Sequence, residues 1–329
     1  METDKLLVME NFKNHSIAVV IPCYKVERHI REVVADIPEY ITSIILVNDA
    51  SPDKTGEILD QLAKENSKIT VLHHSKNQGV GGSMITGFQE AIKQNMDAVI
   101  KIDGDGQMDV SYFSQMLKAI FEGKYNFVKG NRFFDQKMIQ KMPAIRRIGN
   151  FGMGFLIKLA SGYWNVFDPA NGFFCIHTST LKRIDLERVS KRFFFESSLL
   201  IELYYSGAKI KDIAMPAIYA NEKSNLSVWK TLFTFPPKLF NAFLRRIWLR
   251  YFVYDFNIGS LYIFFGIPLF LFGFIFGIIK WIHYASLQIA APTGTIMIAV
   301  ISLILGFQLT LAAIQYDITA CNPFEAEKE

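Results

Sequence analysis

Cysteine is scarce in this sequence, and its spacing excludes the usual structural roles of the residue. The three cysteines, Cys23, Cys175 and Cys321, lie far apart, and no CxxC spacing occurs. A zinc site needs closely spaced cysteine pairs, so we expect none. The composition instead fits reduced thiols.

The start of the chain has no basic region followed by a long apolar core. We therefore expect no secretory signal, and residues 1 to about 225 should stay on the side of the membrane where they are made. The net charge of +4 says little by itself. We expect no nucleic-acid partner.

Charge is missing from two long stretches. No Asp, Glu, Lys or Arg occurs between Lys280 and Asp317, and residues 258–279 are also uncharged. Each stretch holds an apolar span of ~20 residues, which matches the hydrocarbon thickness of a bilayer. The sequence therefore predicts transmembrane helices at about 258–279 and 293–316.

Basic residues are concentrated just before the first span, at Lys238, Arg245, Arg246 and Arg250, whereas the short connection between the spans has no Lys or Arg. By the positive-inside rule, this asymmetry predicts that both termini are cytoplasmic. The chain is then an integral membrane protein, with the plasma membrane of a bacterium as the expected location. Its parts are a cytoplasmic catalytic domain, a juxtamembrane region, two transmembrane helices and a cytoplasmic tail, at residues 1–227, 228–257, 258–316 and 317–329.

Residues 228–257 have a helical pattern with two unlike sides. Large apolar and aromatic side chains cover one half of the helix circumference, and the basic residues lie on the other. This pattern predicts amphipathic helices on the membrane surface, interrupted at Pro236 and Pro237. A helix that packs on the protein core is the alternative.

Apolar runs alternate with helical patterns over the first two hundred residues. We expect strands at 16–23, 43–48, 69–73, 98–102 and 126–129, and helices at 27–37, 54–66, 82–94 and 111–122. Continuous apolar strands with helices between them predict an α/β fold, a mostly parallel sheet covered on both faces. Ligands of such sheets bind beyond the carboxyl ends of the strands.

The most informative segment is 99–107, an apolar run that ends in Asp103 and Asp105, with Gln107 two residues further on. Carboxylate and amide oxygens suit Mg²⁺ or Mn²⁺, which completes its shell with substrate phosphates. The segment therefore suggests a metal site for a phosphate-bearing substrate. A solvated Asp/Gly turn is the alternative.

Earlier strand ends carry further candidate ligand groups. Tyr24 follows the first strand and Asp49 the second, so an aromatic ring and a carboxylate can together hold a base and a ribose or a ring N–H. After the third strand come Gly79, Gly81 and Gly82, which let backbone approach a ligand closely. Their spacing is not GxGxxG, which disfavours a dinucleotide cofactor.

Taken in order, these motifs resemble a known family. Pro-x-Tyr, Val-Asn-Asp-x-Ser-x-Asp-x-Thr, Asn-x-Gly and Asp-x-Asp-x-Gln occur between residues 22 and 107. The set is similar to the inverting GT-A glycosyltransferases of family 2, in the polyprenyl-phosphate branch that includes dolichyl-phosphate mannose synthase. The resemblance covers about residues 17–227, and the two spans match members of that branch with two membrane helices. It implies the GT-A nucleotide-diphospho-sugar transferase fold.

The resemblance implies roles for particular residues of this sequence. A nucleotide pocket would contain Pro22, Tyr24, Glu27, Asp49, Gly79 and Asp103. The metal and diphosphate site would consist of Asp103, Asp105 and Gln107. The acceptor phosphate would be held by Arg132, Arg146 and Asn150. Asp168 and Glu196 would lie near the sugar and, with Asp103, Asp105, Arg132 and Arg146, make up the catalytic set.

The sequence departs from the family pattern at several positions. Lys25 stands where Asn is usual, and Asn150 and Asn171 stand where Ser is frequent. Residues 221–224 replace an Arg-containing loop, which leaves Lys223 as a substitute for the residue that clamps the diphosphate.

The resemblance implies a metal-dependent transfer of a hexose from a nucleoside diphosphate sugar, with inversion, to a polyprenyl phosphate in the lipid bilayer. The cofactor would be Mg²⁺ or Mn²⁺, and UDP-glucose or a similar donor is preferred. A processive polysaccharide synthase is one alternative, although no Gln-x-x-Arg-Trp sequence occurs. A non-catalytic nucleotide-sugar-binding membrane scaffold is another, and a homo-oligomer is left open.

Overall fold

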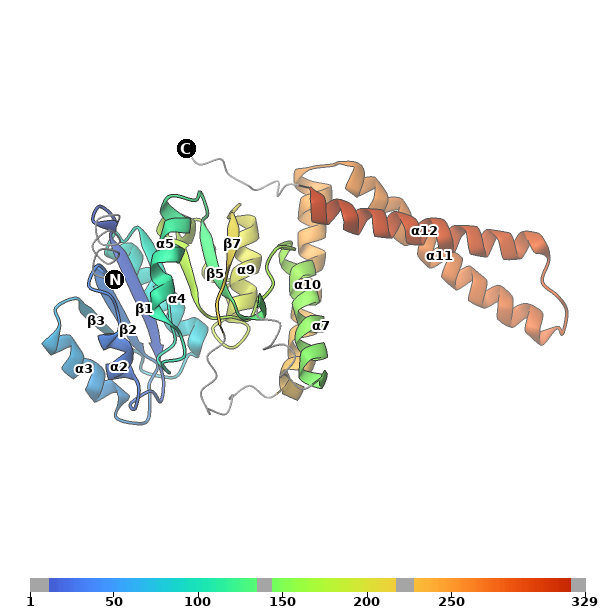
Figure 1. Cartoon of the computed structure of the whole chain (residues 1–329). Coiled ribbons are helices and arrows are strands. Elements are labelled where there is room, and N and C mark those ends of the chain that lie inside the picture. Colours follow the sequence, from blue (N-terminus) through green and yellow to red (C-terminus); the bar gives the residue numbers. More distant parts are fainter. Residues whose placement is uncertain (1–11, 135–143, 217–227, 321–329) are drawn as a thin grey trace. The chain divides into compact units, whose positions relative to one another are not determined.

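The computed structural model describes residues 12–134, 144–216 and 228–320, except for the side chains of residues 134, 144–148, 150 and 228–232. The chain divides into two compact units, with one boundary between residues 242 and 243. Each unit is described by itself below (Figure 1).

The first unit is built on a seven-stranded sheet in the order β3-β2-β1-β4-β6-β5-β7. The first four strands in this order pair in parallel, β6 is antiparallel to both of its neighbours, and β7 is parallel to β5. The mostly parallel α/β sheet predicted from the sequence is therefore confirmed. The strands are β1 (Ile17–Cys23), β2 (Ser43–Asn48), β3 (Ile69–His73), β4 (Ala98–Lys101), β5 (Phe127–Asn131), β6 (Phe174–His177) and β7 (Ile210–Ala214).

Helices cover both faces of the sheet. Successive strand residues point to opposite sides, so neighbouring residues pack against different helices. Phe174 packs between Phe88 and Phe195, each with its ring centroid 6.4 Å away. Its neighbour Phe173 packs on Phe113, with centroids 6.0 Å apart. The helices are α2 (Ile30–Ala35), α3 (Thr55–Glu65), α4 (Val80–Lys93), η1 (Val110–Tyr112), α5 (Phe113–Phe121), η2 (Arg132–Phe134), α7 (Ala144–Ser161), α8 (Thr178–Leu181) and α9 (Phe195–Tyr205).

The next helix along the chain after β7 is α10 (Val228–Trp248). Pro236 and Pro237 lie inside it. The predicted interruption at these prolines is therefore wrong, because a proline dihedral angle of about −65° is itself helical, although each proline removes one N–H donor. The helical geometry changes only after Trp248, in the π-helical segment η3 (Leu249–Tyr254).

Two helices, α11 (Ile258–Ser286) and α12 (Thr293–Thr319), are long and apolar enough to cross a membrane. They include both predicted spans and continue past the predicted ends. Glycines allow their backbones to meet. A Cβ added at Gly273 would lie 2.5 Å from the Leu303 nitrogen, and one at Gly306 would lie 2.2 Å from the Phe270 nitrogen.

Two residues of the predicted basic helix face, Arg246 and Arg250, have a different role within the second unit. Arg246 donates from Nη1 and Nη2 to the two carboxylate oxygens of Asp317, at 2.8 and 2.9 Å, and Arg250 donates from Nη1 at 2.9 Å. Tyr251 donates its hydroxyl to the same carboxylate. The interpretation of Arg246 and Arg250 as an outward basic face is therefore wrong, because a buried carboxylate on α12 takes both cations.

Candidate functional site

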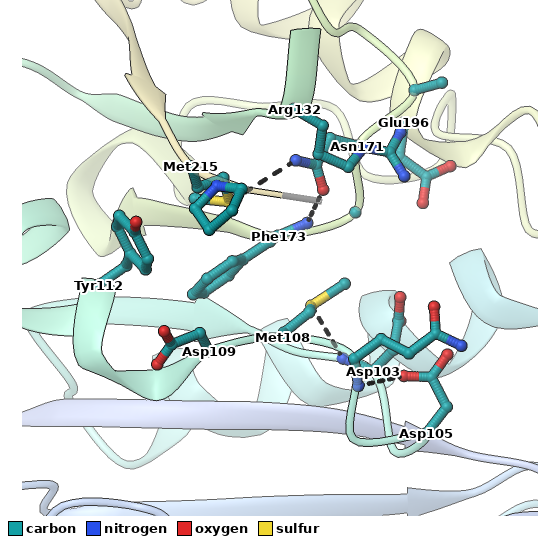
Figure 2. A pocket seen from close by; sticks show the side chains of 14 residues that line it. Asp103, Asp105, Met108, Asp109, Tyr112, Arg132, Asn171, Phe173, Glu196 and Met215 are labelled. Carbon is teal, nitrogen blue, oxygen red and sulfur yellow. Dashed lines mark hydrogen bonds between the residues drawn. The ribbon is translucent and has the colours of Figure 1, made fainter. Parts of the chain in front are cut away.

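A cavity of about 180 Å³ lies where the loops that follow β4, β5 and β7 meet the segment before β6 and the first turn of α9. Figure 2 shows Asp103 and Asp105 on one side of it, and Arg132, Asn171 and Glu196 across from them. Of the predicted site residues, the structure brings together Asp103, Asp105, Gln107, Arg132 and Glu196 in this cavity. Its lining is Asp103, Asp105, Gln107, Met108, Asp109, Tyr112, Arg132, Ala170, Asn171, Gly172, Phe173, Glu196, Met215 and Pro216.

The acidic loop turns sharply after β4. Gly106 has a φ of +74°, a conformation that glycine adopts without strain. The Gln107 N–H donates to Asp105 Oδ1 at 3.1 Å, and the Asp103 N–H contacts the Met108 sulfur at 3.3 Å. These contacts fold the loop back, so that both aspartates and Gln107 line the same cavity.

The chemistry of this donor set fits a divalent cation. Two carboxylates and an amide oxygen are hard ligands of the kind that Mg²⁺ and Mn²⁺ take. In the part of the chain that the structure describes, no group of three or more His, Cys, Asp or Glu side chains forms a complete metal cage. A cation held here would therefore need oxygen ligands from water or from substrate phosphates.

Lys101 is a site residue that the sequence reasoning missed. Its ammonium group is 2.7 Å from Asp103 Oδ1 and 3.8 Å from Glu196 Oε1, and its side chain is 1% exposed. Burial alone would lower the pKa of Lys101, but the nearby carboxylates of Asp103 and Glu196 outweigh it and raise the pKa above its ordinary value. A lysine inside a buried strand, two residues before Asp103, was the available signal.

Glu196 lies in the first turn of α9 and its side chain is 17% exposed. Burial raises the pKa of its carboxyl, and the positive charge of Lys101 opposes that shift. Glu196 therefore lines the cavity and also forms an ion pair with the buried Lys101.

Arg132 and Asp168 form a bidentate ion pair. Arg132 donates from Nε to Asp168 Oδ2 at 2.8 Å and from Nη2 to Oδ1 at 3.1 Å, and its backbone N–H donates to Oδ2 at 3.2 Å. Asp168 is fully buried, whereas the Arg132 side chain is 37% exposed and lines the cavity. Asp168 thus lies behind the cavity wall and orients Arg132.

Asp49 lies at the end of β2, as predicted, but its carboxylate binds the protein itself. It accepts hydrogen bonds from the N–H groups of Gln78 and Gly79, both at 2.7 Å, and is 2.8 Å from His74 Nδ1. Asp49 is 2% exposed. It therefore fixes the loop that leads into α4.

The glycines of that loop approach the chain's own backbone. A Cβ at Gly79 would lie 2.7 Å from the Lys191 carbonyl oxygen, and one at Gly81 would lie 2.1 Å from that of Ser190. Their close approach therefore packs α4 against the segment before α9. The expected approach to a ligand is not needed to explain them.

The other predicted nucleotide-binding residues lie at the ends of β1 and β2. Tyr24 is 43% exposed, and Pro22 is part of β1. Glu27 accepts a hydrogen bond from the Lys54 N–H at 3.0 Å. A second hollow here is lined by Lys25, Glu27, Arg28, His29, Pro52 and Asp53.

Three predicted residues have no described side chain. Arg146 and Asn150 belong to α7, whose backbone is described, but their side chains lie outside the described part. Lys223 lies in residues 217–227, outside the described residues.

Comparison with known proteins gives a family match. Residues 18–185 match the model of "Glycosyl transferase family 2". An uncharacterised protein of Methanocaldococcus jannaschii is 33% identical over 205 residues, which cover 62% of this chain and 82% of that protein.

Two relatives have named activities. A UDP-N-acetylglucosamine–dolichyl-phosphate N-acetylglucosaminyltransferase of Methanococcus voltae is 29% identical, over 62% of this chain and 86% of the relative. An undecaprenyl-phosphate mannosyltransferase of Micrococcus luteus is 26% identical, over 54% and 71%.

Among solved structures, the glucosyl-3-phosphoglycerate synthase of Mycobacterium tuberculosis in complex with Mn²⁺, uridine diphosphate and phosphoglyceric acid is similar in fold. The TM-score is 0.52 at 13% sequence identity, and the alignment covers 74% of this chain and 82% of that one. The predicted GT-A fold is thereby confirmed.

Proposed function

Because the chain belongs to glycosyl transferase family 2, we propose that it transfers a hexose from a nucleoside diphosphate sugar to a polyprenyl phosphate. Two named relatives act on dolichyl phosphate and undecaprenyl phosphate. The two apolar helices α11 and α12 support a lipid acceptor, since they would keep the enzyme at the membrane that contains it.

The observation that carries the proposal is the cavity in which Asp103, Asp105 and Gln107 face Arg132 and Glu196. Asp103, Asp105 and Gln107 would hold Mg²⁺ or Mn²⁺ together with the donor diphosphate. A divalent cation at this position supplies positive charge that stabilises the leaving nucleoside diphosphate. The cation-bound relative in fold supports this assignment.

Arg132 would bind the acceptor phosphate from across the cavity. A phosphate is already an oxyanion at neutral pH, so its attack on the anomeric carbon needs no strong general base. The C1–oxygen bond to the acceptor forms as the bond to the diphosphate breaks, with inversion. Positioning and charge stabilisation then supply most of the catalysis. Arg146 and Asn150 of α7 would join Arg132, and Asp168 would keep the Arg132 guanidinium in place.

Tyr24, Glu27 and Pro22, at the ends of β1 and β2, would bind the base and ribose, and Asp49 with Gly79 would shape the loop beside them. Lys223 would clamp the diphosphate. UDP-glucose or a similar UDP-hexose is the preferred donor. The two named relatives differ from each other in the sugar that they transfer, N-acetylglucosamine in one and mannose in the other.

The test replaces Asp105 with alanine in purified protein, with a labelled donor sugar, Mn²⁺ and a short polyprenyl phosphate. Removing a principal electrostatic contact to the leaving group should lower formation of the lipid-linked sugar about 10²- to 10³-fold. Asp36→Ala is the matched control, since Asp36 is an exposed aspartate at the end of α2. Undiminished product formation by Asp105→Ala would reject the metal role.

A further inference from the structure

Two lysines are buried in the sheet, one on each side of β6. Lys101 of β4 and Lys129 of β5 are both paired in register with Phe174 of β6, so they flank that residue at the same level. Directly paired residues of antiparallel strands point to the same face. Both lysines are 1% exposed.

The segment 168–173 lies against these two ammonium groups. Lys129 Nζ donates to the Asn171 carbonyl oxygen. A Cβ at Gly172 would lie 2.2 Å from Lys101 Nζ, 3.3 Å from Asp103 Oδ2 and 3.5 Å from Glu196 Oε1. A side chain at position 172 would therefore displace the Lys101 ammonium group, so the glycine lets the segment lie against Lys101 and the acidic groups.

The Asn171 side chain completes the attachment of the segment. Its Nδ2 donates to the Gly130 carbonyl at 2.9 Å, and its Oδ1 accepts from the Phe173 N–H at 3.0 Å. Asn171, Gly172 and Phe173 all line the cavity. The two lysines therefore lie behind residues that line the cavity.

Burying two ammonium groups is costly unless they are compensated. The charged groups that shift the pKa of Lys129 are Asp168, Glu196 of α9, Asp212 of β7 and Arg132, and those that shift the pKa of Lys101 are Asp103, Glu196 and Asp105. Glu196 is common to both sets. A hydrophobic residue at either position would avoid the cost, which points to a functional reason for the charge.

We propose that Lys101 and Lys129 are positioning residues whose ammonium groups together seat the 168–173 segment against Asp103 and Glu196. They thereby fix the cavity wall that faces the reacting sugar. The placement of the segment stands on the geometry alone, and only its catalytic consequence rests on the proposed function.

The test uses the full-length protein with Lys129→Met and Gly172→Ala. The first variant removes one ammonium group, and the second places a Cβ where Lys101 Nζ lies, so that the segment and the ammonium group separate without a change of charge. Lys118→Met, at an exposed position of α5, and Gly294→Ala, where nothing lies within 4 Å of an added Cβ, are the matched controls. The readouts are deuterium uptake of a peptide covering 168–173, and kcat and KM for the donor.

Both test variants should speed amide exchange of the segment about tenfold, since each loses a charge-assisted or close contact. They should also lower kcat about tenfold while leaving the donor KM near that of the controls, because a displaced wall misplaces the reacting groups. Unchanged exchange and kcat in either folded variant overturns the proposal. If the wild type transfers no sugar while amide exchange of the segment still rises in both variants, the positioning of the segment by the two lysines is supported and the proposed function is wrong.

Discussion

At the scale of single residues, the ion pair of Arg132 and Asp168 orders the side of the cavity that we propose binds the acceptor phosphate. Asp168 is buried, and both of its carboxylate oxygens accept hydrogen bonds from the Arg132 guanidinium, which lines the cavity. Arginine is suited to this position because its planar fork binds a carboxylate on one edge and still presents charge to a phosphate.

Replacing Asp168 with asparagine should therefore reduce activity through Arg132. The amide keeps the shape but loses the charge and one acceptor, so the guanidinium is no longer fixed. We expect kcat/KM for the lipid phosphate to fall about 10- to 100-fold, with donor binding little changed. Steady-state kinetics against each substrate measure this split, and a loss confined to the donor would contradict it.

Lys129 gives a prediction about pH. Burial lowers its pKa from 10.5 to about 8. Between these values the unfolded chain binds a proton that the folded chain lacks, so the contribution of this group to the free energy of unfolding rises with pH. The midpoint of thermal unfolding of Lys129→Met, minus that of the wild type, should decrease from pH 8 to 10. A difference independent of pH would mean that the lysine is not held in this environment.

At the scale of elements, the sequence predicted β1 to β5 and missed β6 and β7. β6 comprises only Phe174–His177, and β7 alternates buried and exposed residues with Lys211 and Asp212 in its centre. β7 has no continuous apolar run, and the short run at β6, Phe173 to Ile176, was not identified as a strand. The antiparallel insertion of β6 also depends on pairing with distant strands, which one sequence does not display.

The candidate site divides in the same way. Asp103 and Asp105 were predictable because an apolar strand ends in them, and that local pattern is visible in the chain. The contact between Arg132 and Asp168 joins residues far apart in sequence, and the role of Lys101 depends on burial by neighbouring strands. Such features arise from tertiary packing and could not be read from residue types alone.

The close packing of α11 on α12 predicts sensitivity at Gly306. A Cβ there would lie 2.2 Å from the Phe270 nitrogen, so Gly306→Ala should force the helices apart and destabilise the hairpin by ~1–3 kcal/mol. Gly294→Ala, in the same helix but in open space, should have no such effect. Unfolding of the purified proteins in detergent compares the two, and equal midpoints would contradict the packing.

At the scale of the whole molecule, the topology predicted from the sequence places the first unit and both termini in the cytoplasm. Single cysteines introduced at Gln288, between α11 and α12, and at Lys13 distinguish the two sides, in a background with the native cysteines replaced. In intact cells a membrane-impermeant maleimide should label the Gln288 position and spare the Lys13 position, because basic residues before α11 favour the inner side. The reverse labelling would invert the topology.

The proposed reaction depends on the acidic loop at the carboxyl end of β4, which would act on a nucleoside diphosphate sugar beside a lipid phosphate. The most direct measurement incubates the purified wild-type protein with labelled UDP-, GDP- and TDP-hexoses, Mn²⁺ and a short polyprenyl phosphate, followed by organic extraction. Label from one donor should enter the organic phase as a lipid-linked monosaccharide, and a chelator should abolish the transfer. Label that forms an insoluble polymer, or that remains in water with every donor, would contradict the account.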